Sequence, residues 1–338
     1  MSGQPLQTMI VGSLPKPGWL AEPHILRAPW RLSGERLRDG QDDATVVAIH
    51  DQERVGLDVV TDGEQRRQHY ISHFTAGLHG FDYSQLVDKP TRGGKYNARV
   101  PTIVDRVRWT GPVLRDDLAF TLAHTGRPVK ITLPGPMTIA DTAFAPAYAD
   151  QGELIMDLAI AVNHEARALA ELGPAIIQID EPAFNAEPDK ARELGIAALD
   201  RALEGVSCRT AVHVCYGYGT ETVLKWKSAN TSWGQYEQLL PLLAESRVDI
   251  LSLEFAAPKL DPAVLELAGN KAIAFGCVDV SPQPPEPAEV VAERIRAALK
   301  VVPAERLLPS TDCGMAPLDR SLAGAKMRLL VEATALAR

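Results

Sequence analysis

The chain has 338 residues and a formal net charge of -8; 46% of its residues are hydrophobic and 23% are charged. This composition is ordinary for a globular protein, and the negative charge, with no basic stripe, disfavours nucleic acid as a partner. No apolar run approaches the length of a membrane span, and the N-terminal residues MSGQPLQT lack the features of a signal peptide. Four widely spaced cysteines do not resemble a disulfide framework, so a reducing cytoplasm is the expected compartment.

Strand-like runs alternate with amphipathic helical stretches along the whole chain. Eight runs are predicted as strands: Thr8–Leu14, Asp58–Gly63, Val129–Pro134, Ala175–Asp180, Thr210–Cys215, Asp249–Phe255, Ala272–Val278 and Leu307–Asp312. Helices are predicted at Ala44–Gly56, Asp117–Thr125, Gln151–Leu172, Lys190–Leu203, Trp233–Glu245, Pro287–Val301 and Leu318–Ala337. Such alternation predicts parallel βαβ units, and eight of them predict an α/β fold of the (β/α)8 TIM barrel type, as a single domain over residues 1–338. A doubly wound sheet would carry a glycine-rich phosphate loop after its first strand, and none is present.

One segment interrupts this alternation between the second and third predicted strands. Residues 83–115 contain two short strand-like runs, Lys95–Val100 and Arg106–Trp109, and are predicted to form an inserted β-hairpin with flanking loops. The pair Gly93-Gly94 indicates a mobile tip, and a long insertion of this kind often covers a site. The proline-rich segment Pro15–Asp43 is predicted to cap one face of the barrel.

The fifth predicted strand carries two potential metal ligands. His213 and Cys215 are two residues apart, so both side chains project from the same face of the strand. The ends of the sixth and eighth strands add Glu254 and Cys313, and polar groups at the carboxyl ends of barrel strands gather at one rim. Imidazole, thiolate and carboxylate are all zinc ligands, which predicts a zinc site at these four residues.

Each candidate also has an ordinary structural explanation. Glu254 would serve as a salt-bridge partner at the rim, and Cys313 as a small buried residue before Gly314. Cys277 is interpreted as a packing residue. If the zinc site is real, two thiolates make the ion electron-rich and suit it to hold a substrate thiol as a thiolate. That chemistry favours S-alkylation over hydrolysis.

Seven motifs together resemble a known family. They are Ile10-Val11-Gly12-Ser13, Asp62-Gly63-Glu64, Leu133-Pro134-Gly135-Pro136-Met137-Thr138, Gln178-Ile179-Asp180-Glu181-Pro182-Ala183, His213-Val214-Cys215-Tyr216, Ser252-Leu253-Glu254 and Pro309-Ser310-Thr311-Asp312-Cys313-Gly314. In this order they resemble the catalytic C-terminal domain of cobalamin-independent methionine synthase. The large N-terminal barrel of the full-length enzyme has no counterpart, so the chain is similar to a short core form.

The resemblance implies an S-methyltransferase that converts homocysteine to methionine. His213, Cys215, Glu254 and Cys313 match the zinc ligands of the family. Ser13, Glu64 and Asp180 match positions that bind the amine and carboxylate of homocysteine. Glu64 and Asp180 also suit an ammonium group by charge. The ordinary explanation of Asp180-Glu181-Pro182 is a helix N-terminus, where acids are favoured, and substrate contact is expected of Asp180 and Glu64 rather than of Glu181.

Two positions depart from the family, both on the side of the methyl donor. The family has a histidine after the seventh-strand aspartate, where this chain reads Asp279-Val280-Ser281, so Asp279 is the candidate for that catalytic role. Thr142 stands where the family has a tryptophan near the folate. The donor is therefore open between 5-methyltetrahydrofolate, whose amine leaving group needs an acid, and a methylated corrinoid. A helper protein that delivers the methyl group is also open, as is the choice between monomer and homodimer.

Three other functions remain alternatives. A zinc thiol alkyltransferase similar to epoxide:coenzyme M transferases would need a basic residue for its sulfonate, and Glu64 with Asp180 argues against it. A barrel similar to uroporphyrinogen decarboxylase would need an arginine-rich N-terminal motif, of which Arg66-Arg67 is only a faint trace. A non-catalytic, zinc-stabilised binding barrel is the third. The run Arg66-Arg67-Gln68-His69 is expected to be a solvated loop or a partner for the glutamate tail of a folate.

Overall fold

A six-stranded parallel sheet forms the centre of the molecule. The computed structural model describes residues 5–218, 220–230 and 233–338. The strands neighbour one another in chain order, and their bounds are β3 Lys130–Pro134, β4 Ile176–Asp180, β5 Arg209–Val214, β6 Ile250–Glu254, β7 Ala272–Val278 and β8 Leu307–Thr311. β3, β4, β6 and β8 are buried at every residue, as expected for parallel strands covered on both faces. The prediction of an α/β fold with a parallel sheet is confirmed.

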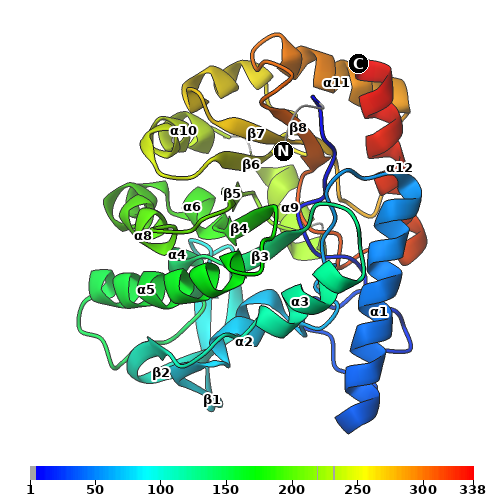
Figure 1. Cartoon of the computed structure of the whole chain (residues 1–338). Helices are drawn as coiled ribbons and strands as arrows, with labels where there is room; N and C mark the ends of the chain where they lie inside the picture. The colour runs from blue at the N-terminus through cyan, green and yellow to red at the C-terminus, as the bar shows by residue number, and fades with distance from the viewer. Residues whose placement is uncertain (1–4, 219, 231–232) are drawn as a thin grey trace.

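Helices lie around the outside of the parallel strands (Figure 1). Those of eight or more residues are α1 Gly34–Val55, α3 Arg115–Ala123, α5 Gln151–Ala170, α9 Glu221–Ala229, α10 Gln235–Glu245, α11 Ala288–Leu299 and α12 Arg320–Ala337. Shorter helices are α2 Tyr70–Thr75, α4 Pro136–Asp141, α6 Pro182–Ala186, α7 Pro188–Lys190, the π-helix η1 Ala191–Gly195, α8 Ile196–Ala202 and the 3-10 helix η2 Pro262–Ala268. The described helices include none that is long and apolar enough to cross a membrane.

The first two predicted strands are extended segments rather than regular strands. In the first segment Met9 N–H donates to Pro309 O in the middle of β8, over 3.2 Å. In the second, Val59 N–H donates to Thr8 O, and Lys130 N–H of β3 donates to Val60 O. A single parallel bridge joins Val60 to Val129. The prediction of full strands at 8–14 and 58–63 was therefore wrong, because too few ladder hydrogen bonds form there, although both segments lie between the edge strands β8 and β3.

An antiparallel pair of long strands, β1 Leu78–Thr91 and β2 Tyr96–Trp109, lies apart from the parallel sheet (Figure 1). The two strand-like runs at 95–100 and 106–109 belong to one strand, and their partner begins at Leu78, before residue 83. The sequence did not reveal this partner because Pro90 and the polar residues of β1 mask its periodicity. Gly93 and Gly94 lie in the turn, as predicted, with φ of 65° and 82°.

Other boundaries also differ from the prediction. Helix α1 begins at Gly34, ten residues before Ala44, so the N-terminal capping segment is shorter than expected. The periodicity of α1 is weak at its start because its buried residues begin only at Gly40. Helix α9 was not predicted, and its residues are not buried. A small apolar cluster of Met9, Val59, Ile176, Ala211, Ile250, Ala272, Ala274 and Leu308 comes from successive parallel segments and fills the space between them.

Candidate metal centre and substrate pocket

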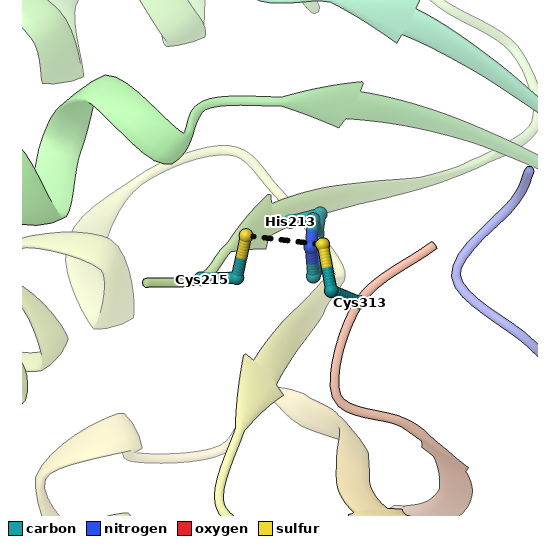
Figure 2. A group of neighbouring side chains, drawn as sticks. All are labelled: His213, Cys215 and Cys313. Carbon is teal, nitrogen blue, oxygen red and sulfur yellow. Dashed lines mark hydrogen bonds between the residues drawn. The ribbon is translucent and has the colours of Figure 1, made fainter. Parts of the chain in front are cut away.

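His213, Cys215 and Cys313 come together at one end of the parallel sheet. His213 is the fifth residue of β5, Cys215 directly follows that strand, and Cys313 follows β8 by two residues. One ligand atom from each of the three side chains lies within 4.8 Å of the others, and all three residues are buried. Figure 2 shows the imidazole and the two thiols directed toward one another. Three of the four predicted metal ligands therefore gather, although their positions span 101 residues of sequence.

The chemistry of this group fits a soft metal ion. The two sulfur atoms lie 3.5 Å apart as free thiols, and the hydrogen bond from Cys313 lowers the pKa of Cys215 well below its ordinary value. The Nε2 atom of His213 is buried without a hydrogen-bond partner among the described residues. Its Nδ1 atom lies 3.0 Å from Ser252 Oγ, which orients the ring. An unpartnered buried nitrogen beside two thiols is the donor set that zinc accepts.

Glu254 is close to this group but is held by other partners. Its side chain is fully buried at the end of β6, accepts a hydrogen bond from Tyr216 N–H over 2.8 Å, and forms an ion pair with Lys227 of α9. Burial raises the pKa of Glu254 to about 6, against the opposing charge of Lys227. Within the described part of the chain, the three-residue metal group does not include Glu254. The sequence did not reveal Lys227, because α9 was not predicted.

Glu64 is held by a buried network beside the pocket. Thr132 Oγ1 donates to it over 3.0 Å, and Arg67 lies 4.0 Å from it while pairing with Asp62 over 2.8 Å. Glu64 has a φ of 57°, in the left-handed region that costs a non-glycine residue about 1 kcal/mol. Backbone strain of this kind is typical of functional sites. Burial raises the pKa of Glu64.

Arg67 corrects the prediction of a solvated loop at residues 66–69. Its side chain is 1% exposed and also donates to Thr132 O. Arg66 is only partly buried and pairs with Asp42 and Asp117. The prediction failed at Arg67 because adjacent arginines in a polar run look alike in sequence, while only Arg67 is fully buried, against Asp62 and Glu64.

Asp180 and Glu181 are neighbours in sequence with different partners. Asp180 accepts from Gln178 Nε2 over 2.7 Å, and burial raises its pKa to about 7. Glu181 accepts from the backbone N–H groups of Met137 and Thr138, both at 2.9 Å, at the start of α4. Any side chain at Gly135 would collide with the carboxyl group of Glu181. Glu181 thus serves the start of α4, a helix distant in sequence, whereas Asp180 lines the pocket.

A cavity of about 250 Å³ opens beside the metal group. Of the predicted site residues, those that line it are Ser13, Glu64, Asp180, His213, Cys215 and Cys313. The sequence did not single out several others that line the same cavity, namely Arg27, Tyr70, Arg92, Lys95, Tyr96 and Tyr218. Arg92, Lys95 and Tyr96 belong to the turn of the antiparallel pair and its edges, so the pair β1–β2 forms part of the wall.

Comparison with known proteins places this chain in a family. The family model for the catalytic domain of cobalamin-independent synthase matches residues 6–336. The chain belongs to this family. It is 32% identical to a methionine synthase of Sulfurisphaera tokodaii, over 98% of this chain and 93% of the relative. It is 33% identical to a methionine synthase of Pyrococcus horikoshii, with the same two shares.

Solved structures agree with the assignment to the cobalamin-independent synthase family. A B12-independent methionine synthase from Shewanella sp. W3-18-1, solved in complex with selenomethionine, superposes on this chain with a TM-score of 0.97 at 42% identity. The match covers 99% of this chain and 98% of the Shewanella chain. A Listeria monocytogenes structure with a TM-score of 0.73 is 20% identical and shares the fold.

The two departures from the family lie at different distances from the pocket. Thr142 lines the cavity, and its hydroxyl donates to Thr138 O over 2.8 Å. Asp279 is not among the described residues that line the cavity. Its carboxylate instead accepts from the backbone and the hydroxyl of Ser281, at 2.8 and 2.6 Å. The hydrogen bonds of the Asp279 carboxylate are thus local, with a residue two positions along the chain.

Proposed function

We propose that the chain is a zinc-dependent S-methyltransferase that transfers a methyl group to homocysteine and releases methionine. Family membership supports the reaction, and one observation supports its location: the cavity is lined at once by the His213, Cys215 and Cys313 group and by the two acids Glu64 and Asp180. A thiol-bearing amino acid needs a soft metal for its sulfur and carboxylates for its ammonium group. Both requirements meet in one pocket.

In this proposal His213, Cys215 and Cys313 would hold the zinc ion. Bound zinc would keep the thiol of the substrate ionised at neutral pH. Ser252 fixes the His213 ring so that Nε2 faces the two sulfurs. Glu254 would be the fourth candidate ligand, and in the structure its carboxylate is paired with Lys227.

The protein groups around the cavity orient the amino acid. Glu64 and Asp180 receive the ammonium group, and Ser13 binds the carboxylate. Arg67 balances the charge of Asp62 and Glu64, so that the ammonium meets a carboxylate already fixed in place. The buried walls exclude water from the thiolate, which strengthens these charge contacts.

The methyl donor is 5-methyltetrahydrofolate or a methylated corrinoid, delivered directly or by a helper protein. Thr142 leaves more room in the wall than the tryptophan of the family would. Asp279 remains a prediction as the acid for a folate leaving group; an Asp279→Asn variant with unchanged turnover would exclude that role.

We further propose that the chain is one (β/α)8 barrel domain with β1–β2 as an insertion. The hydrogen bonds of segments 8–14 and 58–63 to β8 and β3 support closure of the sheet. The parallel bridge from Val60 to Val129 supports the same arrangement.

The deciding experiment is an activity assay on the purified zinc-loaded protein. Homocysteine is incubated with methyltetrahydrofolate and, separately, with methylcobalamin, and methionine is measured. Methionine from either donor supports the proposal and identifies the donor. The alternative of a non-catalytic zinc barrel predicts zinc and homocysteine binding with no methionine from either donor, also after addition of a cell extract that supplies a helper protein.

A further inference from the structure

Lys130 is a lysine buried inside the sheet that the proposed reaction does not use. Its side chain is fully buried, and its ammonium group donates to Ile10 O over 2.6 Å and to Gln178 Oε1 over 2.7 Å. Among the described residues no carboxylate lies within ion-pair distance of it. Burying an ammonium group without a counter-ion costs several kcal/mol. A lysine at this position therefore needs a reason beyond packing.

Gln178 connects Lys130 to the pocket. Its amide nitrogen donates to Asp180 Oδ1 over 2.7 Å and to Val11 O over 3.1 Å. Gln178 and Asp180 are two residues apart on β4, so their side chains share one face. The three side chains form a chain of contacts that runs from inside the sheet to the cavity.

The contact with Lys130 acts together with Val11 O to set which way the Gln178 amide faces. An ammonium group has only donors, whereas the amide has one acceptor oxygen and one donor nitrogen. The amide oxygen must therefore face Lys130, which turns the NH2 group toward Asp180. Without Lys130, a flipped amide would place its oxygen against the Asp180 carboxylate and repel it.

We propose that Lys130 is a positioning residue for the amino-acid substrate. By fixing the Gln178 amide, it supplies a donor to one oxygen of Asp180 and leaves the other oxygen for the ammonium group of the substrate. This inference rests on the proposed function, in which Asp180 binds that ammonium. Burial lowers the pKa of Lys130 to about 7, and the charges of Asp180 and Glu64 offset part of that shift.

The test compares two thiol ligands in two variants, Lys130→Met and Gln178→Leu. Homocysteine carries the α-amine, whereas 4-mercaptobutyrate keeps the thiol and the carboxylate but lacks the amine. In both variants we expect the Kd of homocysteine to rise about 10-fold, as for the loss of one charged hydrogen bond. The Kd of 4-mercaptobutyrate and the zinc content are expected to stay within about twofold of wild type. The double variant is expected to lose no more affinity for homocysteine than Gln178→Leu alone, because Lys130 acts on Asp180 only through Gln178.

Three outcomes separate the possibilities. If wild type binds homocysteine and the variants bind it equally well, the inference is overturned while the proposed function stands. If both ligands weaken together, the role of Lys130 is structural and the inference is also overturned. If wild type does not bind homocysteine, the proposed function fails and the inference falls with it. Gln178→Leu keeps the test valid if Lys130→Met does not fold.

Discussion

Some of the buried acidic groups near the pocket lie against basic side chains. Arg67 neutralises Asp62 and Glu64, and Lys227 neutralises Glu254. The metal group is different, since His213 Nε2 has no protein partner among the described residues. Substitutions at these positions are therefore expected to separate metal binding from substrate binding.

The first prediction concerns the metal ligands. Cys313→Ser removes one sulfur donor, so we expect zinc to be lost and methionine formation to fall at least about 100-fold. Zinc is measured by elemental analysis of the purified protein beside the activity. Cys277→Ser is the matched control, because Cys277 is equally buried but outside the group. Normal turnover by a zinc-free Cys313→Ser protein would refute the mechanism.

Asp180→Asn is expected to leave zinc in place and to weaken homocysteine binding. Loss of one charge-assisted contact to an ammonium group costs about 2 kcal/mol, so the KM for homocysteine should rise roughly 30-fold. Glu181→Gln is the control, since its carboxylate caps α4 and should affect stability rather than affinity. An unchanged KM in Asp180→Asn would remove Asp180 from the substrate site.

His69 gives a prediction about acid stability. Burial, with the charges of Arg27, Arg92 and Lys16, lowers its pKa from 6.5 to about 3 in the folded protein. The unfolded chain takes up this proton below about pH 6.5 and the folded chain does not, so stability is lost as the pH falls from 6.5 toward 3. Because His69 as a residue is only partly buried, we expect a loss of roughly 1 to 2 kcal/mol at pH 5. Denaturant unfolding should show this loss in wild type and a smaller one in His69→Gln; equal losses would contradict the assignment.

At the scale of elements, a buried ion pair joins the turn of β1–β2 to α4, beside other hydrogen bonds from this pair of strands to α4 and α5. Arg92, in the turn, pairs with Asp141 at the end of α4 through both its guanidinium and its backbone N–H. Arg92 and Lys95 thereby stay in the cavity wall. Since the ion pair connects two elements distant in sequence, its loss should lower the stability of the protein and loosen the cavity wall.

Arg92→Met is expected to destabilise the protein by about 3 to 5 kcal/mol, because Asp141 would stay buried without its counter-ion. The double variant with Asp141→Leu should recover part of this loss. Free energies of unfolding for the two single variants and the double variant measure the coupling. Additive losses would show that the two side chains do not act as a pair.

At the scale of the whole molecule, the metal group joins β5 to the segment after β8. A metal ion held there binds the folded state and not the unfolded chain, so it stabilises the fold by mass action. The cavity beside it also joins the parallel sheet, the N-terminal segment and the antiparallel pair. Metal removal is therefore a test of the whole arrangement.

Removal of zinc with a chelator is expected to lower the Tm by about 6 °C, from a loss of about 4 kcal/mol. Thermal unfolding with and without chelator measures the shift, and added zinc should restore it. The Cys313→Ser protein should show no response to chelator. A Tm that is insensitive to chelator in wild type would argue against a zinc site built from these three residues.

The sequence by itself predicted the parallel α/β architecture, the turn at Gly93-Gly94 and the grouping of His213, Cys215 and Cys313. These features follow from local rules: short apolar runs rich in β-branched residues mark buried strands, and polar residues at the ends of parallel strands meet at one edge. The tertiary structure alone decided that Arg67 turns inward, that Lys227 pairs with Glu254, and that β1 begins at Leu78. It also decided that segments 8–14 and 58–63 form few ladder bonds, because pairing depends on which distant groups meet, and a linear pattern does not record that.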